Sequence, residues 1–287
     1  MTEPTSDFVE ANGLRLHYLT WGEAGAPAVV LNHATGFLAW LWQPVAERLA
    51  AEGWHVLAYD IRGHGDSEKP SVEGDNYHWR HAVDDLRGFL DAMGLRNVPF
   101  VGHSMGGAIG LYLEGTRPEY LSRIVAIEPI VMPGAFIPDE NRRDDMAAAA
   151  RKRRHVFGSA EEMLAQYRSR PTFANWRDDL LQLYVKHGTT RREDGSLELK
   201  CSGEVEGAIF SHSGSLGVWD VLPKIEAPVL VMHGKTTEGF LSMVAAQVAS
   251  RVQNGRLETV HGAGHLAPME VPEAVAEMVA EEIGNRK

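Results

Sequence analysis

Residues 101–107 read Val101-Gly102-His103-Ser104-Met105-Gly106-Gly107, a G-x-S-x-G pattern between an apolar run and a segment of small residues. Residues 98–101 predict a short buried strand, and residues 108–113 predict a helix. A sharp turn from strand to helix lifts a serine hydroxyl clear of the sheet edge, and glycine permits that turn because it lacks a Cβ. The pattern therefore predicts that Ser104 is a nucleophile at the end of a strand.

Apolar runs alternate with amphipathic stretches along the chain, which is typical of β-α units. We therefore expect an α/β fold with a mostly parallel central sheet flanked by helices. The expected strands are residues 14–19, 28–31, 55–59, 99–101, 124–127, 228–232 and 256–260. The expected helices are residues 40–51, 79–93, 105–115, 241–250 and 272–283.

The alternation breaks between residues 129 and 222, where the sequence is polar and favours helices. We expect this segment to be a helical cap inserted into a core formed by residues 1–128 and 223–287. Ligands of open α/β sheets bind at the carboxyl edge of the strands, so a cap there would wall the site. The dense basic run at residues 151–155 is expected to be a solvated face of a cap helix.

Composition excludes several classes of function. The 287 residues carry a net charge of -11, which opposes association with nucleic acid, and Cys201 is the single cysteine, which excludes an internal disulfide or a cysteine-based zinc site. Residues 1–10 are polar, and no apolar run approaches the roughly 20 residues that span a bilayer. We expect a cytoplasmic protein with a small-molecule substrate, without nucleic-acid or membrane partners, cofactor or metal.

A nucleophilic serine needs a base and hydrogen-bond donors for the oxyanion. His265 is the preferred base because it lies in a glycine-containing loop, residues 262–266, after the last expected strand; His261 is the weaker candidate. The backbone N–H of Met105 follows the nucleophile and is one expected donor. The backbone N–H of Thr35, in the loop after residues 28–31, is the other.

These features together resemble the α/β-hydrolase superfamily, in its capped esterase, haloperoxidase and dehalogenase-like group. The matching segments are residues 32–37 (NHATGF), residues 60–67 (DIRGHGDS), the serine turn and residues 262–265 (GAGH). The glycine that follows the histidine in the family's first motif is Ala34 here, and its proline is Gly36. By this resemblance, Asp60 and Arg62 are structural residues of a turn.

Two glutamates are candidates for the acid that orients His265. The family most often has an aspartate after the seventh strand, where this chain has threonine followed by Glu238. Glu128 ends the apolar run 124–127, and some related hydrolases and dehalogenases have a glutamate there. A charged residue at that place needs a partner when buried, and His265 would supply one. We favour Glu128 and keep Glu238 as the alternative.

The resemblance also limits the reaction. Dehalogenases and epoxide hydrolases of the superfamily use aspartate where this chain has Ser104, so we expect acyl transfer to water. The expected protein is a cofactor-independent serine hydrolase of carboxylic esters, lactones included, that forms an acyl-enzyme on Ser104. The residues expected to line an apolar acyl pocket are Phe37, Trp40, Met132 and Phe136.

Three other functions remain open on the sequence. A hydrolase of carbon-carbon bonds and a perhydrolase would use the same three residues. A non-catalytic small-molecule receptor could use the same scaffold, because a fold does not determine function.

Overall fold

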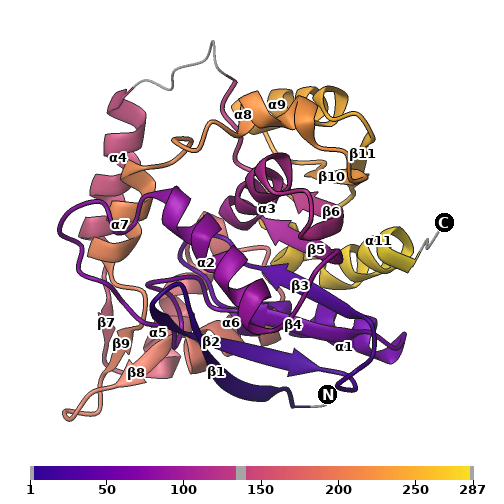
Figure 1. Ribbon diagram of the computed structural model, residues 1–287. Coiled ribbons are helices and arrows are strands. Elements are labelled where there is room, and N and C mark those ends of the chain that lie inside the picture. The colour runs from indigo at the N-terminus through magenta and orange to yellow at the C-terminus, as the bar shows by residue number, and fades with distance from the viewer. Residues whose placement is uncertain (1–2, 134–139, 285–287) are drawn as a thin grey trace.

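An eight-stranded sheet lies at the centre of the molecule (Figure 1). The structure, a computed structural model, describes residues 3–133 and 140–284. The sheet has the order β1-β2-β4-β3-β5-β6-β10-β11, and its parallel part runs from β4 to β11. The predicted mostly parallel sheet is confirmed. Its strands are β1 (Thr5–Ala11), β2 (Leu14–Trp21), β3 (Ala28–Asn32), β4 (His55–Tyr59), β5 (Val98–His103), β6 (Leu121–Ile127), β10 (Val229–Gly234) and β11 (Gly255–Val260).

Helices cover both faces of the sheet because its central strands are apolar on both sides. In β5, Phe100 packs with the helices of one face and Val101 with those of the other, as the two-residue period of a strand requires. One face is covered by α1 (Gln43–Ala51) and α11 (Pro272–Gly284). The other is covered by α2 (Trp79–Ala92), α3 (Met105–Thr116) and α9 (Phe240–Arg251). Across the described residues, no helix combines the length and apolar character that crossing a membrane requires.

The segment between β6 and β10 contains helices and also a small antiparallel sheet of order β7-β9-β8. This sheet differs from the helical insertion expected from the sequence. Its strands have only two or three residues, too few for an alternating pattern to stand out. The elements are α4 (Glu140–Lys152), β7 (Val156–Phe157), α5 (Ala160–Arg168), η2 (Pro171–Phe173), α6 (Asp178–His187), β8 (Thr189–Arg191), β9 (Leu197–Leu199), α7 (Gly203–Ser211), α8 (Val218–Val221) and η3 (Leu222–Lys224).

This inserted segment contacts the carboxyl edge of the sheet through polar groups. The indole N–H of Trp79 donates to the backbone oxygen of Ile209 at 3.0 Å. The amide of Arg177 donates to the backbone oxygen of Met269, in α10 (Ala267–Glu270), at 2.9 Å. The insertion also packs on η1 (Ala39–Trp42), which follows the loop after β3. The inserted segment thereby contacts the segments that follow β3, β4 and β11.

Glu114 is a buried acid in α3, and its titration links stability to pH. Its side chain is 2% exposed, and Oε2 has no hydrogen-bond partner among the described residues. Burial raises the pKa of Glu114 to about 7, against partial opposition from backbone groups of Leu121 and Ala227. The folded protein therefore holds a proton that the unfolded chain releases at lower pH, so this residue lowers stability as pH rises toward about 7.

We predict that Glu114→Gln removes this penalty. The variant should be more stable than the parent by about 1–3 kcal/mol at pH 8, and the difference should shrink toward pH 5. Urea unfolding at both pH values measures it, with Glu73→Gln at an exposed position as the control. An equal difference at the two pH values would show that Glu114 does not carry the proton.

Candidate active site

Ser104 lies at a strained turn between β5 and α3. Its backbone has φ 56° and ψ -115°, in the left-handed half of conformational space, at a cost of about 1–3 kcal/mol. The turn needs glycine beside it, because a Cβ on Gly106 would lie 2.5 Å from the backbone oxygen of Asn32. The amide of Ser104 donates to the backbone oxygen of Ile127 at 2.9 Å. The neighbouring strands therefore hold the strained residue in place.

Ser104, His265 and Glu128 form one line of contacts. Ser104 Oγ is 3.2 Å from His265 Nε2, and His265 Nδ1 is 3.3 Å from Glu128 Oε2. These residues follow β5, β11 and β6, so the carboxyl edge of the sheet brings them together. Glu238 is exposed, and no hydrogen bond or ion pair within the described residues joins it to His265.

The carboxylate of Glu128 is 3% exposed and accepts several hydrogen bonds. Besides His265, the amide of Gly234 and the hydroxyl of Thr237 both donate to Oε1 at 2.6 Å. Burial alone would raise the pKa of Glu128, but the hydrogen bonds from His265, Thr237 and Gly234 outweigh it and lower the pKa below its ordinary value. The acid is therefore held as a carboxylate beside the imidazole.

His103 and Thr237 belong to the site and were not predicted. His103 Nε2–H donates to the backbone oxygen of His265 at 2.7 Å, which ties the serine turn to the loop that carries the base. Burial lowers the pKa of His103 to about 3, so the ring is neutral. The contact joins residues 162 positions apart, and no local pattern marks such a pair.

Two buried histidines support the loop that contains Thr35. His33 donates from Nδ1 to the backbone oxygen of Ala34 and accepts the amide of Ile61 at Nε2. His64 donates from Nδ1 to the backbone oxygen of Arg62 and accepts the amide of Gly36 at Nε2. Burial lowers the pKa of both rings, to about 3 for His64, so each keeps one donor and one acceptor.

The amides of Thr35 and Met105 have no acceptor among the described residues. The two residues are neighbours, because the Thr35 hydroxyl contacts Met105 Sδ at 3.4 Å. One unpaired N–H group follows Ser104 directly and the other lies on the neighbouring loop, so both are candidate donors to an oxyanion.

The expected pocket residues lie in different places. Phe37 packs against Trp176 and Tyr184 and lines a cavity of about 10 Å³ next to His103. Trp40 instead stacks on His187, with ring centres 3.6 Å apart. Met132 is half-buried beside Gly214, and Phe136 lies outside the described residues. Phe37 is thus placed next to the site, whereas the Trp40 ring packs on His187 of α6. A wider surface hollow of about 640 Å³, between α5, α6 and β8, includes none of these residues.

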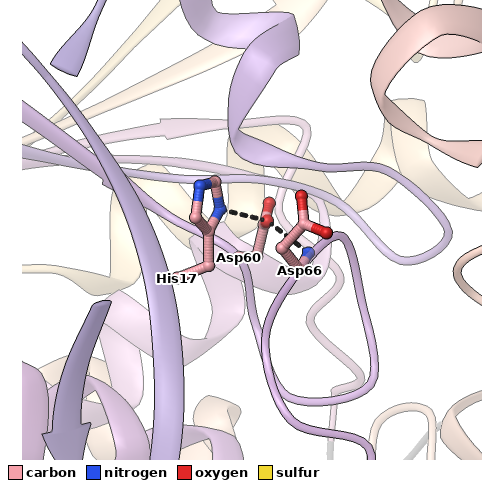
Figure 2. A group of neighbouring side chains, drawn as sticks. All are labelled: His17, Asp60 and Asp66. Atoms are coloured by element: carbon pink, nitrogen blue, oxygen red, sulfur yellow. Dashed lines mark hydrogen bonds and ion pairs between the residues drawn. The ribbon is translucent and has the colours of Figure 1, made fainter. Parts of the chain in front are cut away.

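Asp60 and Asp66, on the turn after β4, lie close to His17 of β2 (Figure 2). Asp60 accepts hydrogen bonds from His17 and from the amides of Ala39 and Asp66. Burial opposes the charge of Asp60, but His17, together with His33 and the amide of Ala39, holds its pKa well below the usual range. The carboxylate of Asp66 pairs with Lys200 at 2.7 Å. Both carboxylates therefore have partners within the protein, which agrees with the structural role expected for this turn.

Known proteins share this architecture. A family model described as alpha/beta hydrolase fold matches residues 27–272. Epoxide hydrolase A of Mycobacterium tuberculosis is 35% identical over 139 residues, which span 48% of this chain and only 42% of that relative. The bifunctional esterase/perhydrolase DCH of Acinetobacter calcoaceticus is 24% identical over 92% of this chain and 94% of its own length.

A solved structure, that of E-2-(acetamidomethylene)succinate hydrolase, superposes with a TM-score of 0.82 at 19% identity, over 98% of this chain and 100% of the other. At that identity the likeness shows the fold alone. The family model spans the strands β3 to β11, the serine turn and the histidine loop. The chain therefore belongs to the alpha/beta hydrolase fold family.

Proposed function

We propose that the protein is a cofactor-independent serine hydrolase of carboxylic esters, lactones included. The observation that carries the proposal is the line from Ser104 Oγ through His265 to Glu128, with contacts of 3.2 and 3.3 Å. Nucleophile, base and orienting acid in hydrogen-bond reach of one another are the signature of an activated serine.

In this mechanism His265 Nε2 takes the proton of Ser104 as Oγ attacks the ester carbonyl carbon. The oxyanion accepts hydrogen bonds from the amides of Thr35 and Met105. His265 then gives the proton to the leaving alcohol, and an acyl group remains on Ser104. A water, deprotonated in turn by His265, attacks the acyl carbon, and the carboxylic acid leaves as His265 returns the proton to Ser104 Oγ. Glu128 holds the Nδ1 proton and stabilises the imidazolium throughout.

The relatives favour this reaction over epoxide opening. The esterase/perhydrolase relative aligns over nearly its whole length, whereas the epoxide hydrolase relative aligns over less than half of its own. Superfamily members that open epoxides use aspartate at the position of Ser104. The perhydrolase activity for which the Acinetobacter relative is named also favours a second candidate, in which hydrogen peroxide takes the place of water on the acyl-enzyme. Peroxide-dependent formation of a peracid would distinguish it.

Replacing the nucleophile tests the proposal directly. With short and medium p-nitrophenyl esters, Ser104→Ala should lose at least about a thousandfold in kcat, because the acyl-enzyme cannot form. A fluorophosphonate should label the parent protein at Ser104, as peptide mass spectrometry would show. Ser250→Ala, at an exposed position on α9, is the control. Undiminished hydrolysis by Ser104→Ala would refute the mechanism.

The two glutamates can be compared by matched amide substitutions. Glu128→Gln should lower kcat by about 10²- to 10⁴-fold, since the amide neither orients nor stabilises the imidazolium as a carboxylate does. Glu238→Gln should change kcat less than about twofold, because the side chain is exposed. A larger loss in Glu238→Gln would assign the acid to the loop after β10. Thermal melts of both variants check that they fold.

Removing the Thr237 hydroxyl should change the titration of the acid. The hydroxyl donates to Glu128 and lowers its pKa, so Thr237→Val should raise the pKa of Glu128. Carbon-13 NMR of the glutamate carboxyl groups follows this, with Thr236→Val as the neighbouring control. An unshifted Glu128 resonance contradicts the prediction.

A further inference from the structure

The loop that carries Thr35 is held between two layers of the protein. On the side of the core, the amide of Gly36 donates to His64 Nε2 at 2.9 Å. On the side of the inserted segment, the hydroxyl of Tyr184 in α6 donates to the backbone oxygen of Gly36 at 3.2 Å. The residue next to Thr35 is thus bound through both of its backbone polar groups, one to the core and one to the inserted segment.

Glu206, in α7, occupies the space above Gly36. A Cβ on residue 36 would lie 2.5 Å from Glu206 Oε1, and Gly36 has φ +82°, so the loop and the carboxylate fit together only with glycine there. Glu206 is 8% exposed. A buried carboxylate is therefore packed directly on the loop whose N–H is proposed to hold an oxyanion.

Arg153 supplies the matching positive charge. Its Nε lies 2.9 Å from Glu206 Oε2, and both side chains are largely buried, at 16% and 10% exposure. Arg153 also donates from Nη2 to the backbone oxygen of Cys201 at 2.9 Å. Figure 1 shows α4, which precedes Arg153, beside α7, and the two helices pack closely. The expectation of a solvated basic run therefore fails at Arg153, because α7 covers it.

Burying the Arg153–Glu206 ion pair costs desolvation free energy, and a functional role would account for its presence. Two buried charges are rarely more stable than an apolar pair of similar size, and the Nε–Oε2 contact lacks the angle of a hydrogen bond. A carboxylate at this place would also repel negative charge on a substrate oxygen held by Thr35. Burial raises the pKa of Glu206 and the charge of Arg153 opposes that rise, so the guanidinium both favours the carboxylate form and balances its charge.

We propose that Arg153 and Glu206 form a positioning pair. Through this pair the inserted segment fixes the position of the Thr35 loop, and Arg153 neutralises the carboxylate of Glu206 beside the oxyanion. The pair acts through Gly36 and does not touch the reacting atoms. This inference rests on the proposed serine hydrolase mechanism. If the pair acts in this way, turnover requires that α4 and α7 pack as they do in this structure. Ester binding is largely unaffected.

A double-mutant cycle tests the pair. At a pH where Glu206 is ionised, Arg153→Met should lower kcat about 10- to 100-fold and change KM less than about threefold, because an unpaired carboxylate then lies against the Thr35 loop. Glu206→Gln should lower kcat only a fewfold, and the double variant should recover most of the loss of Arg153→Met. Arg154→Met is the matched control, since Arg154 pairs with Glu162 at the exposed surface.

Two results of this double-mutant cycle would overturn the inference. One is a double variant no more active than Arg153→Met alone, which would mean that the charge of Glu206 is not what Arg153 offsets. The other is an Arg153→Met effect confined to KM for esters whose acyl group carries a carboxylate, which would make Arg153 a substrate anchor.

Hydrogen exchange separates this inference from the proposed function. Amides of residues 33–37 should exchange faster in Arg153→Met than in the parent and the Arg154→Met control, whatever the substrate. If the parent protein shows no Ser104-dependent hydrolysis, the proposed function fails, and exchange still reports whether the pair positions the loop. If hydrolysis depends on Ser104 but exchange and kcat are unchanged in Arg153→Met, only the positioning pair fails.

Discussion

The buried carboxylate of Glu128 ties together the carboxyl ends of three neighbouring parallel strands. Glu128 follows β6, its donors Gly234 and Thr237 lie at and after the end of β10, and His265 follows β11. A charge removed from water is tolerated only when such donors surround it. The three loops must therefore keep their relative positions for the fold to hold this charge, and the same positions align His265 with Ser104.

Backbone strain is concentrated at the same carboxyl edge of the sheet. Four non-glycine residues in the described part of the chain have positive φ, and two of them, Asn12 and Asn97, are of a type that tolerates it. The other two are Ser104 and Glu128. Each is held by an amide hydrogen bond to an adjacent strand, to Ile127 and Met232 respectively. The rigid parallel sheet thus maintains two conformations that an isolated turn would not adopt.

The loop after β3 departs from the family's pattern in a way that the structure explains. A proline at position 36 would lack the amide that His64 accepts and could not adopt φ +82°. Glycine allows both and leaves room for Glu206. Gly36 therefore contacts both the core and the inserted segment. By the inference drawn above, the geometry of the Thr35 loop depends on how the insertion packs on the core.

Local patterns were enough to predict the α/β class, the central strands and the strand-turn-helix around Ser104, because apolar periodicity and glycine placement are encoded by neighbouring residues. The edge strand β1, largely exposed, and the short strands β7 to β9 carry too weak a pattern to be predicted. Sequence also limited the acid to Glu128 or Glu238. Only tertiary structure put Glu128 within reach of His265, tied His103 to the histidine loop and buried Arg153 against Glu206. These contacts depend on the order of the strands and on where the insertion rests, and residues more than 40 positions apart leave no local pattern of their pairing.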